Sequence, residues 1–324
     1  MTTGGRLDAQ RFTQLYEGMK QQIAKVVVGQ DELVDGVLVA TLARGHVLVE
    51  GAPGLGKTLV ARALAVVSGC VFKRIQFTPD LMPSDVTGSS VFDRQTSTFT
   101  FIQGPIFAQL LLADEINRAP AKTQSALLEA MQDRQVTVDG TSRPLPSPFV
   151  VVATQNPVES QGTYPLPEAQ LDRFLVKLTV DDPPRDVEQT IVRRHADGFD
   201  PSDLSALQAA VSPADIAEMQ AHAQSVRCDD AIIAYIVDVV RRTRDDRAIE
   251  LGASPRASIA LMKTAQVFAA SQGRVFVTPD DVKPMFAPVL RHRVMLHPDA
   301  QLQGVTPDDR ILEIVRAAPV PRMA

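Results

Sequence analysis

The sequence has few of the residues that mark secreted, disulfide-stabilised or zinc-binding proteins. Its 324 residues include no tryptophan and only two cysteines, Cys70 and Cys228, and aromatic residues make up 5% of the chain. The two cysteines lie far apart in the sequence and match no metal-ligand spacing, so they suggest neither a disulfide framework nor a zinc motif. We expect both to be reduced thiols of a cytoplasmic protein.

Long apolar runs are also missing from the sequence. No stretch of 18 apolar residues occurs, and even the segment from Ala231 to Val240 is interrupted by Asp238, so we expect no membrane span. The segment Met1–Asp8 lacks the apolar core of a signal peptide. The formal net charge of −5 argues against a dedicated nucleic-acid binder, because such proteins usually present a basic face.

The most informative segment is a glycine-rich loop that directly follows the apolar run 46–50. Glycines in such a loop let successive backbone N–H groups turn inward around phosphates, the lysine reaches the β- and γ-phosphate oxygens, and the hydroxyl ligates Mg²⁺. A helix predicted from Leu59 to Ser68 would direct the positive end of its dipole at the same phosphates. The loop reads G-x-x-x-x-G-K-[ST] and consists of Gly51, Ala52, Pro53, Gly54, Leu55, Gly56, Lys57 and Thr58.

A second strand supplies the carboxylates that a phosphate-binding loop of this kind needs. The run 109–113 is continuously apolar, as expected of a strand buried on both faces of a parallel sheet, and it ends in Asp114 and Glu115. The first carboxylate can bind Mg²⁺ through water, and the second can polarise a nucleophilic water. This pair indicates an ATPase rather than a kinase, because a kinase does not need a base that activates water.

A third apolar run and two arginines complete the set of candidate residues. The run 149–153 leads into Asn156, whose side chain at a strand tip could orient the attacking water. Arg173 comes just before a strand-like run, and Arg256 lies at the start of a predicted helix. Together with the phosphate site, both arginines are candidates for stabilising charge at the γ-phosphate.

The order of strands, helices and breaks predicts two domains. At 324 residues, of which 45% are hydrophobic, the chain is long enough for both. A leading helix is predicted from Asp8 to Val27, and alternating strands and helices then continue to Val180 as an α/β sandwich. The acidic, proline-containing segment 181–185 breaks the pattern. Helices follow, three of them preceded by a capping hydroxyl, a proline and an acid, at Ser212, Thr278 and Thr306.

This arrangement resembles the AAA+ ATPases and, within them, the MoxR family. The resemblance spans about residues 10–320, and its matching segments include LLLADEINR at 110–118, KTQSALLEAMQD at 122–133 and YPLPEAQLDRF at 164–174. The pieces specific to the family are 114–118 with 122–131, and 168–174. It implies an α/β fold, an AAA+ P-loop αβα sandwich with a mostly parallel five-stranded sheet, over residues 1–182. Two predicted hairpins near 78–104 and 135–149 resemble the helix-2 insert and the pre-sensor-1 hairpin. An all-α lid over residues 183–324 would follow.

The resemblance also implies a role for each matching residue. Lys57 and Thr58 correspond to the Walker A pair, and Asp114 and Glu115 to the Walker B metal ligand and catalytic base. Asn156 resembles sensor 1, Arg173 the arginine finger, and Arg256 the sensor 2 arginine, which acts on its own or on the neighbouring subunit's nucleotide. Arg118 resembles a residue near the subunit boundary. The segment that packs by the adenine corresponds to Val28, Gly29 and Gln30, and the loop residues through Leu59 complete the nucleotide contacts.

The function implied by the resemblance is ATP hydrolysis with Mg²⁺ in a ring, expected to be a hexamer of identical chains. Such a ring would remodel client proteins in a chaperone-like role, and its usual partner in the family has a von Willebrand factor A domain. The alternatives are a nucleic-acid motor related to the MCM helicases and a subunit of chelatase type. A scaffold that binds nucleotide without hydrolysis is disfavoured, because both Glu115 and Arg173 are present.

Overall fold

The computed structural model describes residues 7–95, 97–157 and 162–321. Most of the N-terminal segment that argued against a signal peptide, residues 1–6, lies outside the described residues. Across these three ranges, no helix is both long and apolar enough to cross a membrane.

The centre of the molecule is a parallel five-stranded sheet, as the sequence predicts. Each strand pairs in parallel with its neighbours, so the carboxyl ends of all five lie at the same edge. We call this edge, which includes the end of the first strand, the P-loop edge. The strand order is β2 (Phe72–Gln76), β5 (Leu110–Asp114), β8 (Val150–Gln155), β1 (Val47–Gly51) and β9 (Val176–Val180).

The central strands are apolar up to their carboxyl ends because helices cover both faces of the sheet. Leu110 and Leu112 of β5 belong to one hydrophobic core, whereas Leu111 and Ala113 belong to a second core on the other face. The first core includes residues of α1 (Ala9–Ala24), α2 (Asp31–Leu42) and α3 (Lys57–Ser68). The second includes residues of α4 (Pro83–Thr87) and α5 (Ala121–Asp133). Two short elements complete this part, η1 (Ile116–Arg118) and α6 (Glu168–Leu171).

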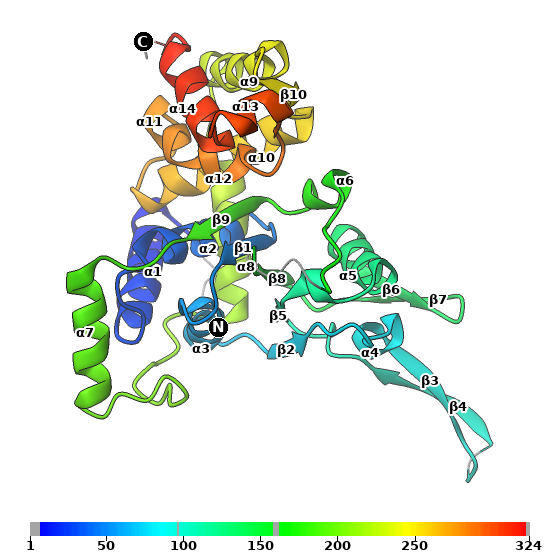
Figure 1. The fold of residues 1–324 in the computed structure, drawn as a ribbon. Coiled ribbons are helices and arrows are strands. Elements are labelled where there is room, and N and C mark those ends of the chain that lie inside the picture. The colour runs from blue at the N-terminus through cyan, green and yellow to red at the C-terminus, as the bar shows by residue number, and fades with distance from the viewer. Residues whose placement is uncertain (1–6, 96, 158–161, 322–324) are drawn as a thin grey trace.

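Two antiparallel hairpins extend from this sandwich at the positions that the sequence predicts. The longer one projects well away from the body of the molecule, at the lower right of Figure 1. The longer hairpin is rooted at α4 and the shorter one at α5, and these two helices pack against each other on the side of the second core. The hairpins are formed by β3 (Gly88–Asp93) with β4 (Thr98–Gln103) and by β6 (Gln135–Val138) with β7 (Thr141–Pro144).

The C-terminal part is helical, with one small addition that the sequence did not predict. Capping boxes begin three of the helices, at Ser212, Thr278 and Thr306, as expected. The addition is an antiparallel ribbon of β10 (Ile249–Leu251) and β11 (Met295–Leu296). The helices are α7 (Arg185–Ala196), α8 (Pro213–Ser225), α9 (Asp230–Asp245), α10 (Pro255–Ser271), α11 (Pro279–Val282), η2 (Lys283–Met285), α12 (Phe286–Leu290), α13 (Pro298–Leu302) and α14 (Pro307–Ala317).

The C-terminal helices divide into two groups by their position. Helix α10 packs against α1, α2 and α8, so the first hydrophobic core continues from the sandwich into the lid. Helix α7, which has no buried residue among those described, instead stands apart at the left of Figure 1. It follows β9 directly and therefore leaves the sheet at the P-loop edge. The boundary at residue 182 stays a prediction, because hydrophobic contacts cross it.

Candidate functional site

The glycine-rich loop connects the end of β1 to the start of α3. Gly54 and Gly56 have φ angles of 86° and 81°, a left-handed conformation that favours glycine. Gly51 is required for a different reason, since a Cβ there would lie 2.6 Å from the carbonyl oxygen of Val180. Because Gly56 is the N-cap of α3 and has no side chain, the first N–H groups of the helix face the loop uncapped. The loop is therefore built to receive phosphate oxygens.

Lys57 lies across this loop, with Nζ donating a hydrogen bond to the carbonyl oxygen of Gly51. Burial lowers the pKa of Lys57, and the nearby carboxylates, first of Asp114 and then of Glu115, act in the opposite direction. The structure thus brings the predicted lysine of the loop close to both predicted carboxylates. A phosphate group bound in the loop would lie next to the ammonium group of Lys57.

Asp114 ends strand β5 and is only 8% exposed. One carboxylate oxygen accepts a hydrogen bond from Thr154 Oγ1 at 2.5 Å, and the other lies 2.6 Å from Arg74 Nη2. Thr154 is on β8 and Arg74 on β2, the two strands that flank β5. Sequence reasoning missed both residues, because only the strand pairing brings them to Asp114.

Glu115 has an unusual backbone and two side-chain partners. Its φ is 55°, which is uncommon for a residue other than glycine and is frequent at functional sites. Its carboxylate accepts hydrogen bonds from Gln76 Nε2 at 2.7 Å and from Arg118 Nη1 at 2.9 Å. The sequence analysis did not predict a role for Gln76. Its position at the end of the segment that forms β2 could have indicated that it lies near the other strand ends. The role inferred for Arg118 at the subunit boundary stays a prediction, and its observed contact is with the candidate base.

Asn156 and Thr58 lie at the same edge of the sheet. Asn156 follows β8 directly and is 5% exposed, and its carbonyl oxygen lies 3.4 Å from Asn117 Nδ2. Thr58 is in the first turn of α3. The Thr58 hydroxyl and the Asp114 carboxylate are hard oxygen donors, which suits Mg²⁺ with the remaining ligands supplied by water and phosphate. The donor set present therefore fits the predicted metal.

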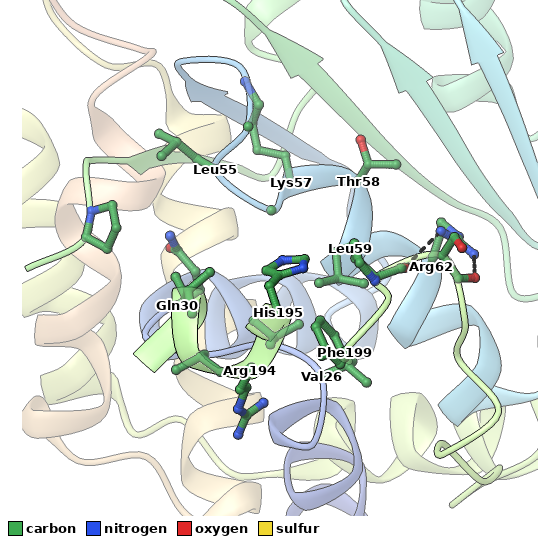
Figure 2. A pocket seen from close by; sticks show the side chains of 18 residues that line it. Val26, Gln30, Leu55, Lys57, Thr58, Leu59, Arg62, Arg194, His195 and Phe199 are labelled. Carbon is green, nitrogen blue, oxygen red and sulfur yellow. Dashed lines mark hydrogen bonds between the residues drawn. The ribbon is translucent and has the colours of Figure 1, made fainter. Parts of the chain in front are cut away.

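A cavity of about 470 Å³ adjoins the glycine-rich loop. One wall consists of the segment before α2, including Val28 and Gln30. Between them Gly29 has a φ of 68°, and a Cβ there would lie 2.2 Å from Val187 of α7. Figure 2 shows that the wall facing Lys57 and Thr58 comes from a second segment, after β9, which sequence reasoning did not connect with the nucleotide. Its residues include Ile191, Arg194, His195 and Phe199.

Neither candidate arginine lines this cavity, and both lie near Asp172. Arg173 precedes β9. In the parallel pairing of β1 with β9, Val47 pairs with Val176 and Gly51 with Val180. Arg173 is therefore near the amino ends of the strands. The P-loop edge lies beyond the other end of β9, and the four residue steps along this strand alone span roughly 13 Å. Arg256 lies beside the residue that precedes Arg173, with Nη1 3.6 Å from the carboxylate of Asp172. The single chain thus separates Arg173 and Arg256 from Lys57, Asp114 and Glu115.

Comparisons with known proteins agree with this geometry. Residues 46–176 match the family described as "ATPase family associated with various cellular activities (AAA)", and residues 241–314 match the AAA lid domain. Chaperone MoxR1 of Mycobacterium tuberculosis is 42% identical over 93% of this chain and 81% of its own length. The uncharacterised protein YeaC of Bacillus subtilis is 48% identical over 93% of both chains. A solved structure from Cytophaga hutchinsonii, described as a candidate ATPase, is 37% identical and superimposes with a TM-score of 0.89 over 97% of both chains.

Proposed function

This chain belongs to the MoxR family of AAA+ ATPases, and from this premise we propose that it hydrolyses ATP with Mg²⁺ in a homo-oligomeric ring and thereby remodels client proteins. The observation that carries the proposal is the placement of the candidate residues. Lys57, Asp114 and Glu115 lie at one edge of the sheet, and Arg173 and Arg256 lie toward the other. Each chain therefore offers two halves of a site, on different sides of the molecule.

The half at the P-loop edge binds the nucleotide and prepares the water. Lys57 and the amides of α3 neutralise the phosphates, and Thr58 with Asp114 would hold Mg²⁺, which when bound neutralises charge on the phosphate oxygens. Glu115 is the candidate base that orients and deprotonates the attacking water, with Asn156 beside it at the tip of β8. The base and ribose fit the adjoining cavity, between the segment of Gln30 and that of His195.

The half near the amino ends of the strands would complete the site of the next subunit. Arg173 and Arg256 provide two cations that would stabilise the negative charge developing on the γ-phosphate. An arginine acting in this way raises turnover by roughly 10³–10⁵. Because the two halves lie on different sides of the chain, repeating the contact gives a head-to-tail assembly, which closes into a ring if the rotation permits. We expect this ring to be a hexamer.

Client remodelling is the activity that the relatives support. One of them is named a chaperone, and the two projecting hairpins offer surface outside the ATPase core. We expect a cytoplasmic ring with a partner that has a von Willebrand factor A domain. Capture of bound proteins by a Glu115→Gln ring held in the ATP state, followed by mass spectrometry, would identify the client.

Two substitutions at the P-loop edge test the ATPase directly. Lys57→Ala removes a cation that contacts phosphate, so nucleotide binding should be lost in a titration with a fluorescent ATP analogue. Glu115→Gln removes only the base, so binding should persist while turnover falls by about 10²–10⁴. Lys283→Ala, at an exposed ion pair with Asp280 on the lid, is the matched control and should behave as the parent.

Two results would contradict the proposal. Parental nucleotide affinity in Lys57→Ala would remove the phosphate site. Strong stimulation of turnover by single-stranded DNA would favour a nucleic-acid motor instead.

A further inference from the structure

Asp172, the residue before Arg173, contacts the lid through both of its carboxylate oxygens. Oδ1 accepts a hydrogen bond from Arg293 Nε at 2.7 Å. Oδ2 accepts one from the Ser254 hydroxyl at 3.3 Å and lies 3.6 Å from Arg256 Nη1. The side chain is 19% exposed. Asp172 thus joins the backbone that carries one candidate arginine to the side chain of the other.

Arg293 fixes the same segment from the lid side. Its side chain is only 4% exposed, and its guanidinium donates to the carbonyl oxygens of Phe174 at 2.6 Å and Leu175 at 3.1 Å. The neighbouring His292 ring nitrogen lies 3.1 Å from the Phe174 carbonyl oxygen. A buried arginine with this many acceptors leaves little freedom for the backbone on either side of Arg173.

The lid has other attachments, so these contacts are not needed merely to hold it in place. Helix α10 packs on α1 and α2 through the continuous hydrophobic core, and Arg291 donates to the Thr179 hydroxyl at 2.7 Å. The carboxylate of Asp172 instead contacts Arg256 directly and the buried Arg293, which holds the backbone that follows Arg173.

We propose that Asp172 and Arg293 form a clamp that presents Arg173 and Arg256 as one rigid pair to the nucleotide of the neighbouring subunit. Asp172 is then a positioning residue for hydrolysis, although it touches no nucleotide. The proposal rests on the proposed function, because the pair acts only across a subunit boundary. It also implies that the lid and the segment 172–175 move together, so lid motion in one subunit changes the active site of the next.

Asp172→Asn tests the clamp because it keeps the size of the side chain and removes its charge. In the nucleotide-free subunit, amide hydrogen exchange of residues 172–175 should become at least about tenfold faster, since the buried Arg293 loses its counter-charge. The matched control is Asp238→Asn, which breaks an exposed ion pair with Arg242 on the same lid and should leave this exchange unchanged. Unchanged exchange in Asp172→Asn overturns the clamp, whether or not the protein is an ATPase.

Mixed rings provide the readout that a general loss of stability would not give. Rings of Asp172→Asn alone should bind ATP as the parent does and turn it over at least about tenfold more slowly. Adding Glu115→Gln subunits should restore activity at interfaces that combine an intact clamp with an intact base. Adding Arg173→Ala subunits should not, because both variants lack the same half of the site. Parental turnover, rescue by both partners or rescue by neither overturns the proposal.

A double variant keeps the test decisive if Asp172→Asn does not fold. Replacing both members of a buried ion pair by neutral residues is often tolerated, so Asp172→Asn with Arg293→Met removes the clamp without leaving a buried charge. This variant should fold and show the same rescue pattern in mixed rings. A folded double variant with parental turnover rejects the clamp. If the parent ring itself is inactive, the proposed function is contradicted, and the hydrogen-exchange result for Asp172→Asn then decides whether the clamp exists.

Discussion

At the scale of single residues, His46 joins three elements of the ATPase core. It lies just before β1, its Nε2 is 3.1 Å from the carbonyl oxygen of Met131 in α5, and its Nδ1 accepts a hydrogen bond from the Val151 amide of β8 at 3.0 Å. This pattern requires a neutral ring that is protonated on Nε2. Burial lowers the pKa of His46 to about 4, so the ring stays neutral in the folded protein.

The lowered pKa predicts a loss of stability in acid. An unfolded histidine titrates near 6.5, so between pH 6.5 and 4 the unfolded chain binds a proton that the folded chain does not. The stabilisation is present above pH 6.5, falls as the pH drops toward 4, and amounts to about 3 kcal/mol in total. His46→Gln should be less stable at pH 7 and show a flatter dependence over this range in urea unfolding, whereas the exposed His297→Gln should follow the parent.

A steep parental dependence in His46→Gln would assign the acid sensitivity to other groups. The buried His292 is the leading alternative, because burial also lowers its pKa. Both buried rings favour the neutral form, so His46→Gln should remove part of the slope and not all of it.

Sequence alone predicted the residues of the candidate site that belong to contiguous motifs. The loop around Lys57 and the carboxylates at the end of β5 are local patterns with local geometry, and the structure places them together. Arg74, Gln76 and Thr154 were missed because they reach the carboxylates through strand pairing. No local pattern encodes that pairing.

At the scale of elements, a cation–π contact joins the two projecting hairpins. The guanidinium carbon of Arg143, on β7, lies 3.9 Å from the ring centroid of Phe101, on β4. Nearer the tip of the longer hairpin, Phe99 is 74% exposed, and its ring centroid lies 5.2 Å from that of Phe92 on the opposite strand. A two-stranded hairpin is marginally stable by itself, so its order depends on the contacts at its root.

Removing this contact should loosen the longer hairpin without unfolding the core. A cation–π contact contributes about 0.5–2 kcal/mol, so Arg143→Met should speed amide exchange over residues 88–103 by roughly 2- to 30-fold. Arg94→Met, at an exposed position near the tip, is the matched control. Equal exchange in the two variants would show that Phe101 and Phe107, whose rings lie 5.8 Å apart, hold the root without Arg143.

The elements show where prediction from sequence reached its limit. Strands and hairpins followed from alternating or continuous apolar runs, and three helix starts followed from their capping boxes. The position of α7 could not be predicted in this way. None of its described residues is buried, so its sequence pattern does not indicate which element it packs against. The ribbon of β10 and β11 was missed for a related reason, since strands of three and two residues carry too little periodicity.

At the scale of the whole molecule, the sheet separates the two halves of the proposed active site. The loop around Lys57 follows the carboxyl end of β1, and Arg173 precedes the amino end of the neighbouring strand β9. The sequence left open whether Arg256 serves its own subunit or the next. In the structure it lies beside Asp172, on the side of Arg173, so we expect both arginines to act on the neighbouring subunit.

Mixed rings distinguish these arrangements through which halves complement each other. Rings of Arg173→Ala or of Arg256→Ala should bind ATP but hydrolyse it at least about tenfold more slowly than the parent. Mixing either variant equally with Glu115→Gln should restore activity, because about a quarter of the head-to-tail interfaces then combine intact arginines with an intact base. The turnover of each mixture is measured after ring assembly has been confirmed by sedimentation.

The decisive mixture combines Arg173→Ala with Arg256→Ala. If both arginines act on the neighbouring subunit, every interface in these rings lacks one of them, and activity stays low. If Arg256 instead served its own subunit, an Arg173→Ala subunit would keep its own Arg256 and could receive Arg173 from an Arg256→Ala neighbour. Interfaces of this kind would recover hydrolysis. Recovery in this mixture would therefore show that Arg256 acts within its own chain, which would require the lid to leave Asp172 and cross to the P-loop edge.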